Sequence, residues 1–401
     1  TGGDQTLSAG TLNMSGIYRT TDDIAWTGGV KLAGTVGLDA GGTVDITGAV
    51  DADKAGGALK VVAGGDLRLA AGVGADAALS SLDLTGKRVW LGTGPAARLR
   101  TTGDQTVTGP VTLVSDLLLV SDRNVVLDGT VDSDAGGARV LVVNAGKDTH
   151  LTGDVGATHA LAQLVTDAGA GTTGAVTVSA ADAAVIGGTT MLGSGADAAR
   201  MSVVTSGGQS HGDIVVLAAD TTLSTAGSLD FTAAVRGDGK PGRGLVANSG
   251  GNTAFMGGVS QLASLTTDAA QGSGGTLRIT GAVTSGAQNF NESKATLSGS
   301  FTGTGLNIAG ATVIAGRTII DMGTGKVDFG GTIQAAGAAV DSTLQVTGGD
   351  ITFKDAVGSV EKLTSLDVTG AGIGVSNSIY TRGALTLTGP TRLNTARVTL
   401  S

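Results

Sequence analysis

The 401-residue chain has a net charge of −9, no Cys, and aromatic side chains at only 2% of its positions. This acidic balance disfavours binding to nucleic acid, whose phosphates require clustered Lys and Arg, and it disfavours adhesion to anionic lipid. A hydrophobic content of 41% excludes simple disorder, and no run reaches the roughly 18 apolar residues of a membrane-spanning helix.

The acidic residues indicate strands and turns rather than helices. Of the 34 acidic side chains, 32 are Asp, and only Glu292 and Glu361 are Glu. Asp favours turns because its short carboxylate binds nearby backbone N–H groups, whereas Glu favours helices. The chain also contains 70 Gly and 4 Pro, with no collagen-like triplet period. We therefore expect a chain made almost entirely of strands and turns.

Three short phrases return in the same order along the chain. A Thr-rich phrase opens at Thr20, Thr101, Thr205, Thr284 and Thr381. A Gly-rich corner ends at Asp66, Asp148, Asn252 and Asp350. A Val turn that precedes a Leu-x-x-Leu strand begins at Val73, Val155, Val259 and Val357. The phrases predict super-repeats over residues 17–98, 99–201, 202–280 and 281–380, with a partial copy over 381–401.

The spacing of these phrases favours a solenoid. The interval from a Thr phrase to the next Val or Ile turn is 30 residues in three copies, but 49 residues from Thr284 to Ile333. The interval from a Val landmark to the next Thr phrase is 28, 25 or 24 residues in three copies, but 50 residues from Val155 to Thr205. A solenoid accepts a whole inserted coil because each repeat contacts only its neighbours. We therefore expect one additional coil in each long interval.

Within a coil, the strands show ordinary half-buried patterns. Apolar and polar residues alternate in segments 44–47, 67–69, 111–113 and 385–387, and Gly and Asp mark the corners between them. The sequence predicts an all-β fold, a parallel β-helix or β-solenoid that is continuous over residues 1–401. At about 20 residues per coil, the chain would form about 20 coils stacked at strand spacing.

The repeats resemble those of a known group of proteins. The stretch Thr-Thr-Gly-Asp-Gln-Thr-Val-Thr-Gly-Pro (101–110), the Gly-Gly-Asp corner and the Ser-Leu-Asp-Leu strand are similar to the repeat regions of filamentous haemagglutinin-like bacterial adhesins of two-partner secretion. The resemblance covers essentially the whole chain in repeat style. It implies a right-handed parallel β-helix that is exported through an outer-membrane transporter. The secretion domain of that family is not evident in the chain, so the segment corresponds to repeat stalk.

One tripeptide is a candidate receptor loop. Arg236, Gly237 and Asp238 follow the turn at Val235, and the segment 239–242 lengthens this corner. Integrin-type recognition of such a loop is one interpretation, and a chance match in a Gly- and Asp-rich chain is the other. We expect the substitution Asp238→Ala to leave stability unchanged. Residues 237–242 also match G-x-G-x-x-G, but no strand–helix–strand context supports dinucleotide binding.

The other polar residues point to structural roles. Paired Asp residues at two corners (Asp51/Asp53 and Asp132/Asp134) are interpreted as local turn residues, because calcium requires six to eight oxygen ligands. The histidines, His150, His159 and His211, lack metal-ligand pairing and are expected on the surface. Asp and Asn exchange at the Gly-rich corner, which favours capping over acid–base chemistry. No metal, cofactor or catalytic residue is predicted.

An enzymatic alternative exists because polysaccharide-active enzymes also use β-helices. They require carboxylates a few ångströms apart and usually line their grooves with aromatic and basic residues. The aromatic residues of this chain are scattered in sequence, and Phe255 and Phe353 occupy the repeat position of Leu69 and Leu151, which predicts core positions. We expect no enzymatic activity.

The sequence thus predicts an extracellular structural rod of a bacterial surface fibre or adhesin, in cell-surface or biofilm attachment. The chain begins at Thr1 without Met, and we expect a processed protein or a segment of a longer one. Expected partners are further copies end to end or the rest of a longer chain, a host-cell or matrix surface, and the transporter during secretion. The alternative is a sheath, surface-layer or matrix subunit that polymerises through uncapped strand edges.

Overall fold

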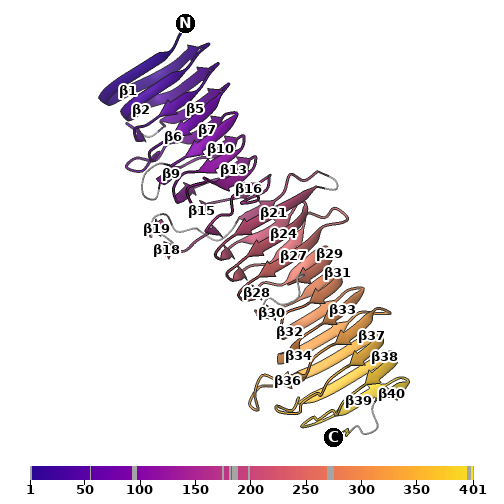
Figure 1. The fold of residues 1–401 in the computed structure, drawn as a ribbon. Helices are drawn as coiled ribbons and strands as arrows, with labels where there is room; N and C mark the ends of the chain where they lie inside the picture. The colour runs from indigo at the N-terminus through magenta and orange to yellow at the C-terminus, as the bar shows by residue number, and fades with distance from the viewer. Residues whose placement is uncertain are drawn as a thin grey trace. The chain divides into compact units, whose positions relative to one another are not determined.

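The computed structural model describes residues 2–54, 56–92, 97–173, 176–179, 182, 188–196, 199–268, 275–394 and 399–400. The regular elements among them are β-strands, and nearly all of them pair in parallel between successive coils. The predicted all-β parallel β-solenoid is confirmed, with about 16 turns in place of the expected number of about 20. The chain separates into two compact units, residues 1–214 and 215–401 (Figure 1). No helix in the described ranges has the length and apolar character needed to span a membrane.

In unit 1 the coils stack on three faces, which we call A, B and C. β1 (Gln5–Thr20) pairs with β2 (Ile24–Ala40), and β2 pairs in turn with the first short strand of each face. Face A contains β3 (Val44–Ile46), β6 (Asp66–Leu69), β8 (Arg88–Leu91), β11 (Val111–Leu113), β14 (Val131–Ser133) and, through Val155, β21 (Arg200–Thr205). Face B contains β4 (Val50–Ala52), β9 (Ala97–Thr101), β12 (Leu117–Ser121), β15 (Val140–Ala145), β17 (Gln163–Thr166) and β22 (Gln209–His211). Face C contains β5 (Ala58–Ala63), β7 (Ser81–Thr85), β10 (Gln105–Thr108), β13 (Val125–Asp128), β16 (Thr149–Leu151) and β20 (Thr189–Leu192).

Unit 2 also has three faces, called D, E and F, and its later strands run through corners so that one strand serves two faces. Face D contains β23 (Ile214–Leu217), β26 (Val235–Gly237), β39 (Leu385–Thr388) and parts of β29 (Val259–Thr267), β31 (Val283–Phe290), β32 (Lys294–Thr302), β34 (Ala311–Asp321), β37 (Thr343–Phe353) and β38 (Ser365–Val375). Face E contains β24 (Asp220–Thr225), β27 (Gly244–Ser249), β33 (Gly305–Ile308), β35 (Lys326–Phe329), β40 (Thr391–Leu393) and the remaining parts of β29, β31, β37 and β38. Face F contains β25 (Leu229–Phe231), β28 (Thr253–Phe255), β30 (Thr276–Thr280), β36 (Ile333–Ala335) and the beginnings of β32 and β34.

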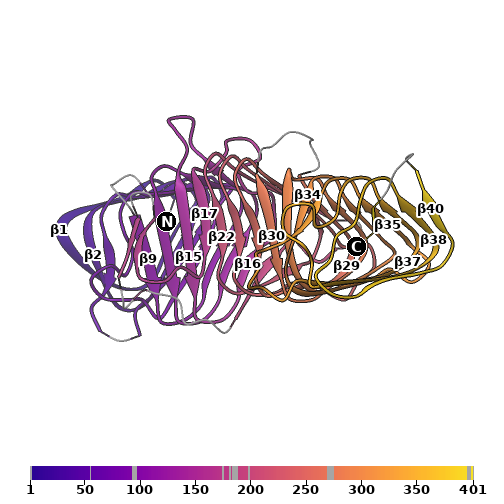
Figure 2. The same cartoon turned by 90° about the horizontal axis from the view of Figure 1, so that it is seen from below.

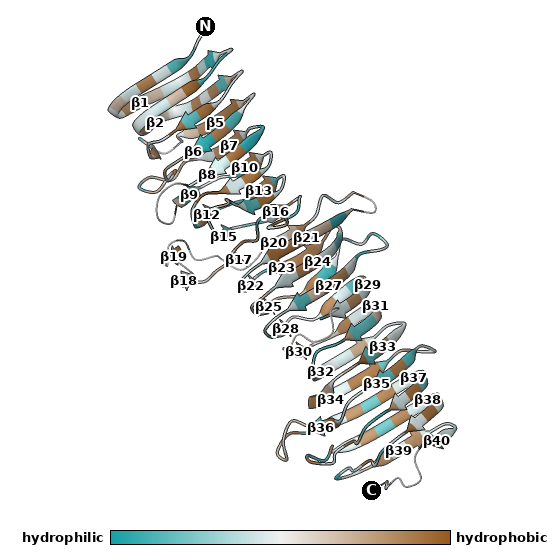
Figure 3. Cartoon of the chain, in the orientation of Figure 1, coloured by the Kyte–Doolittle hydropathy of each residue, from teal (hydrophilic) through white to brown (hydrophobic). Residues whose placement is uncertain are grey.

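The interior of each unit consists of ladders of apolar side chains in register. On face A, Val44, Leu67, Val89 and Val111 pair in succession, and each is at most 2% exposed. The residue between two inward positions points outward, so hydropathy alternates along the strands (Figure 3). Because each buried Val or Leu contributes about 1.5–3 kcal/mol, the ladder supplies a core without large aromatic residues.

Two phenylalanine ladders lie inside unit 2. The rings of Phe231 and Phe255 are stacked with centroids 4.9 Å apart, and those of Phe329 and Phe353 with centroids 5.3 Å apart. All four side chains are at most 1% exposed. The predicted core positions of Phe255 and Phe353 are therefore confirmed. Identical rings stack because parallel, in-register coils place them directly above one another.

Coil length varies more than the sequence analysis assumed. Paired residues in successive coils lie between 17 residues apart (Ala295 and Thr312) and 26 residues apart (Ile320 and Val346). Figure 2 shows the coils of each unit from a second direction. The repeat counterparts Val50 and Val131 lie on faces B and A, because a super-repeat does not contain a whole number of coils.

One of the two predicted additional coils is present. Between Thr284 and Ile333, Ala295 pairs with Thr312 and Thr312 pairs with Ile333, so the extra residues form a complete coil.

The second predicted coil is wrong. Val155 pairs directly with Val203, and Thr149 pairs with Thr190, so no coil lies between them. The extra residues of this interval leave the solenoid after Thr166 and include an antiparallel pair, β18 (Gly171–Thr173) and β19 (Val176–Val178). We call residues 167–188 the excursion. Phrase spacing could not distinguish the two cases because a coil and an external loop add the same number of residues.

Candidate functional site

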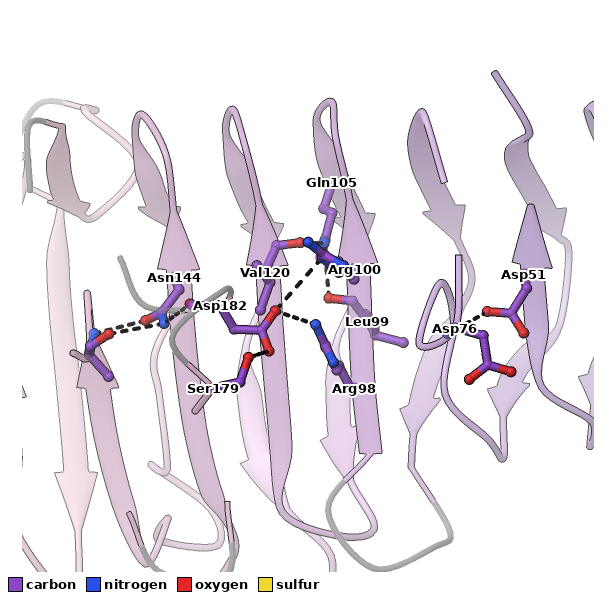
Figure 4. Close-up of polar contacts among 11 residues, drawn as sticks. Asp51, Asp76, Arg98, Leu99, Arg100, Gln105, Val120, Asn144, Ser179 and Asp182 are labelled. Carbon is purple, nitrogen blue, oxygen red and sulfur yellow. Dashed lines mark hydrogen bonds and ion pairs between the residues drawn. The ribbon is translucent and has the colours of Figure 1, made fainter. Parts of the chain in front are cut away.

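The first Asp of the paired-Asp corners joins one coil to the next. Asp51 Oδ1 accepts hydrogen bonds from the backbone N–H groups of Asp76 and Ala77, at 2.9 and 3.2 Å (Figure 4). Asp132 Oδ1 accepts from the N–H groups of Thr158 and His159 at 2.9 and 3.1 Å. These partners lie one coil ahead, so the predicted role in a local turn is corrected to a cap between coils.

The fourth copy shows that this cap needs an oxygen acceptor and no negative charge. Gln334 Oε1 accepts from the N–H groups of Val360 and Glu361 at 3.0 and 2.9 Å, in the place taken by Asp132 in the second copy. An amide oxygen therefore replaces a carboxylate oxygen at this corner.

The candidate receptor loop occupies the same corner in the third copy, where the cap is missing. Arg236 stands at the position of Asp51 and Asp132, directly after a buried Val. The next coil lacks the turn that the acceptor serves elsewhere, since Val259 and Leu262 are three residues apart while Val155 and Leu161 are six apart. Gln261 closes this shorter corner with a positive φ of 57°. Because no turn amides need an acceptor here, Arg is compatible with the position.

Asp238 of the candidate loop holds an internal ion pair. Arg243 Nε donates to Asp238 Oδ1 at 3.0 Å, and Arg243 NH2 donates to Oδ2 at 2.9 Å. The hydrogen bonds from Arg243 lower the pKa of Asp238 to about 2. The Arg243 side chain is only 2% exposed, and Gly237 is buried at the end of β26. The second copy has a similar fork, in which Arg139 Nε donates to Asp134 at 2.9 Å.

This geometry gives the tripeptide a structural explanation. The loop tip at residues 239–242 is exposed, but the Asp238 carboxylate is engaged on both oxygens. A receptor that required this carboxylate would have to displace a bidentate Arg. Receptor binding by Arg236, Gly237 and Asp238 stays a prediction, and the expectation that Asp238→Ala leaves stability unchanged is revised below.

The Gly-rich corner carries a ladder of Asp and Asn side chains. Asp104 Oδ1 accepts from the N–H of Asn124, Asn124 Oδ1 accepts from the N–H of Asp148, and Asp148 Oδ1 accepts from the N–H of Thr189. The exchange of Asp and Asn in one role is confirmed, because Asn252 likewise accepts from Thr276. Asp350 differs from the expectation, since it lies within β37.

The histidines do not all lie on the surface. His159 is exposed and His150 is half-buried, but His211 is fully buried in β22, so its predicted position is wrong. His211 Nδ1 lies 3.0 Å from Thr166 Oγ1, and burial lowers the pKa of His211 to about 4. The alternation of β22 places Gln209 and His211 inward, a pattern that the short strand alone does not reveal.

The excursion covers the outer surface of face B. Outward side chains of β12, β15 and β17 are buried against it, so that these strands are covered on both sides. The buried cluster consists of Leu118, Val120, Val140, Val142, Val165, Ala168, Val176 and Val178. Most outward positions in these strands are apolar, and this loss of alternation was the sequence signal for a second layer.

Polar contacts fix the excursion at its end. Asp182 is 2% exposed and accepts hydrogen bonds from Arg98 and from the Ser179 hydroxyl (Figure 4). Arg100 Nε lies 3.7 Å from the same carboxylate. Asn144 Nδ2 donates to the carbonyl oxygens of Ala168 and Asp182 at 3.1 and 2.6 Å. Both oxygens and both cations are therefore used to hold this layer in place.

Sequence reasoning missed two pairs of buried acids. Asp167 follows Thr166 with a positive φ of 62°, and burial together with the charge of Asp213 raises the pKa of Asp167 to about 7. Asp268 follows Thr267 with a positive φ of 46°, and it lies close to Glu292. The shared Thr-Asp-Ala sequence at 166–168 and 267–269 was the available signal.

The second acid pair lies inside unit 2. Burial is the largest cause that raises the pKa of Glu292 to about 7, and the charge of Asp268 acts in the same direction. Thr267 Oγ1 donates to Glu292 Oε2 at 2.7 Å, and the N–H of Ser249 donates to Asp268 at 2.9 Å. Two such carboxyls close together are stable when one of them keeps its proton.

Within the described ranges, no group of three or more His, Asp or Glu side chains is arranged to hold a metal ion. The expectations of no metal and no cofactor stay predictions. Comparison of the chain with protein-family models, with curated proteins and with solved structures found no match in any of the three.

Proposed function

We propose that the chain is an extracellular structural element of a bacterial surface fibre or adhesin. The observation that carries the proposal is the continuous parallel pairing of coils on three faces of each unit. Such pairing makes every coil a support for the next one, which is the property required of a stiff spacer.

The use of the charged side chains supports this function. Asp51, Asp132 and the corner ladder of Asp104, Asn124 and Asp148 are hydrogen-bonded to the backbone of a neighbouring coil. These contacts oppose sliding between coils, because a shift of register would break them together. Carboxylates in these positions serve cohesion, and we expect no enzymatic activity from them.

The resemblance to filamentous haemagglutinin-like exoproteins supports the extracellular location. It also supplies the expected partners, namely an outer-membrane transporter during secretion and a host-cell or matrix surface afterwards. The absence of Cys in 401 residues is compatible with passage through a transporter in an unfolded state.

The alternative is a sheath, surface-layer or matrix subunit that polymerises end to end. The strand β1 is paired on one side with β2, and β39 and β40 are paired on one side with β38. A free strand edge accepts another strand, from the same chain or from a second copy.

Protease treatment of intact producing cells tests the location. The proposal predicts that external protease removes the chain while cytoplasmic marker proteins remain intact. Recovery of the undigested chain with the cytoplasmic fraction would contradict it.

A further inference from the structure

The outer surface of face A carries a single aromatic side chain within an in-register row. Arg68, Trp90, Thr112 and Asp132 are consecutive partners on β6, β8, β11 and β14. Val89 and Leu91 point into the core, so the alternation of β8 directs Trp90 outward, where it is half-buried. The small Thr112 follows the large Trp90 in the row. This step in side-chain size leaves a hollow beside the indole ring.

Hollows lie on both sides of Trp90. One has a volume of about 310 Å³ and is lined by Arg68, Leu69, Ala70, Trp90 and Val114. The other has a volume of about 420 Å³ and extends from Trp90 across Thr112 to Asp132 and His159. We call the second one the Trp90 groove. Its volume lies within the range of small-ligand sites, and it crosses three neighbouring coils.

The Trp90 groove offers positive charge that the fold does not use. Lys87 and Arg88 line it and are exposed, and neither side chain has a polar partner within the described part of the chain. By contrast, Asp134 is engaged by Arg139 and one oxygen of Asp132 is engaged by backbone amides. In a chain with a net charge of −9, two unpaired cations beside the groove favour an anionic ligand.

The groove also offers partners for hydroxyl groups and for a flat apolar ring face. The buried indole Nε1 of Trp90 has no acceptor among the described residues, and an unpaired buried donor is costly. Thr112 and the second oxygen of Asp132 supply further donor and acceptor positions along the row. Arg68 lies over the ring with its guanidinium carbon 5.8 Å from the centroid, which holds the indole upright in the row.

From these features we propose that the Trp90 groove binds an acidic glycan whose sugars carry carboxylates. A sugar ring stacks on the indole, its hydroxyl groups contact Thr112 and Asp132, and the carboxylates of the glycan pair with Lys87 and Arg88. A single-stranded nucleic acid would also place rings and anions together. The Asp132 carboxylate and the negative charge of the whole chain disfavour it. The site binds without cleaving, because both nearby Asp residues already hold structural contacts.

Tryptophan fluorescence gives a direct measurement, since Trp26 and Trp90 are the only two tryptophans and Trp26 is fully buried. The full chain would be titrated with oligogalacturonate, with neutral dextran oligosaccharides, with a sulfated heparin oligosaccharide and with an oligodeoxynucleotide. We expect a saturable change in emission with oligogalacturonate and none with dextran. We also expect tighter binding of oligogalacturonate than of the sulfated or nucleic-acid probe.

Variants locate the binding. Because Trp90 emission is lost in Trp90→Ala, the variants are compared by calorimetry. Trp90→Ala should weaken binding roughly tenfold or more, through loss of the stacked ring. The double variant Lys87→Gln/Arg88→Gln should weaken binding and remove most of its salt dependence. Arg278→Gln/Lys294→Gln makes the same change of charge on exposed strands of unit 2 and should leave binding unchanged.

Three results would overturn the proposal: equal binding of dextran, tighter binding of the sulfated or nucleic-acid probe, or unchanged affinity in Trp90→Ala with intact circular dichroism. Release of new reducing ends from oligogalacturonate would overturn the assignment of binding without cleavage. None of these results bears on the proposed structural role, which depends on coil pairing.

Discussion

At the scale of single residues, acidic side chains in this protein act mainly on neighbouring coils. Asp51 and Asp132 accept two backbone amides from the next coil, and Gln334 does the same with an amide oxygen. Arg236 replaces them where the next coil has lost its turn. The Arg-Gly-Asp tripeptide thus has an origin in the geometry of this corner, independent of any receptor.

The Asp238–Arg243 fork predicts a loss of stability in Asp238→Ala. Removal of the carboxylate leaves the guanidinium of Arg243 buried without its charged partner, which costs about 3 kcal/mol. Chemical denaturation measures the change in the free energy of unfolding. Asp134→Ala is the matched control, and it should cost less because the Arg139 side chain is 28% exposed. Equal stability of Asp238→Ala and the unaltered protein would contradict this account of the corner.

Sequence reasoning identified the corner but not its contacts. It recognised that Asp and Asn exchange at the Gly-rich corner, because a short side chain with an oxygen acceptor is what such a corner needs. It assigned these contacts to local turns, since a partner about 25 residues away becomes visible only when the coil length is known. The five-residue spacing of Asp134 and Arg139, repeated in Asp238 and Arg243, was the signal that could have revealed the forks.

The Glu292–Asp268 pair predicts a specific pH dependence. Because the pKa of Glu292 rises from its ordinary value of 4.5 to about 7, the folded protein keeps this proton to a higher pH than the unfolded chain. The resulting stabilisation is fully present below pH 4.5 and is lost as the pH rises to about 7.

The substitution Glu292→Gln should remove this dependence. At pH 8 the variant should be more stable than the unaltered protein by at most about 3 kcal/mol, and near pH 4.5 the two should be similar. Denaturant unfolding across this pH range gives the comparison. Glu361→Gln, at the only other Glu and on an exposed loop, should leave the pH profile unchanged. Parallel profiles for the unaltered protein and Glu292→Gln would show that the pair does not hold the proton.

At the scale of elements, the excursion is the feature that distinguishes face B from the other faces of unit 1. It leaves at Asp167, packs Val176 and Val178 on the outward side chains of β12 and β15, and is fixed through Asp182. Spacing correctly predicted the additional coil near residue 295 and wrongly predicted one here. Both insertions have nearly the same length, and only the apolar outer positions of Leu118 and Val142 separate the cases.

Cysteine pairs can test the path of the excursion because the chain contains no Cys of its own. His150 and Met191 are partners on β16 and β20, so His150→Cys/Met191→Cys should form a disulfide on mild oxidation. An intervening coil would instead separate the two positions by about 10 Å. Mass spectrometry after proteolysis identifies the linked peptides.

Two further pairs calibrate this experiment. Val126→Cys/His150→Cys joins adjacent coils and should also become linked, whereas Val126→Cys/Met191→Cys spans two coils and should not. Linking in the first control without linking between positions 150 and 191 would restore the additional coil that the structure lacks.

At the scale of the whole molecule, composition and repeats were sufficient to predict the fold class. Abundant Gly, Asp in place of Glu, and phrases at regular intervals together favour stacked strands over a globular core. The number of coils was overestimated because coil length varies with the size of each corner, and corners differ between repeats. The Trp90 groove could not be predicted, since it depends on which outward residues of neighbouring coils become partners.

The proposed structural role depends on the chain being a part of an extracellular fibre. Electron microscopy of producing cells, with antibody against residues 1–401 and with a strain that lacks the chain, tests this most directly. The account predicts antibody along the length of surface fibres, and loss or shortening of those fibres in the deletion strain. Unchanged fibres in the deletion strain, with the chain released as separate soluble particles, would contradict it.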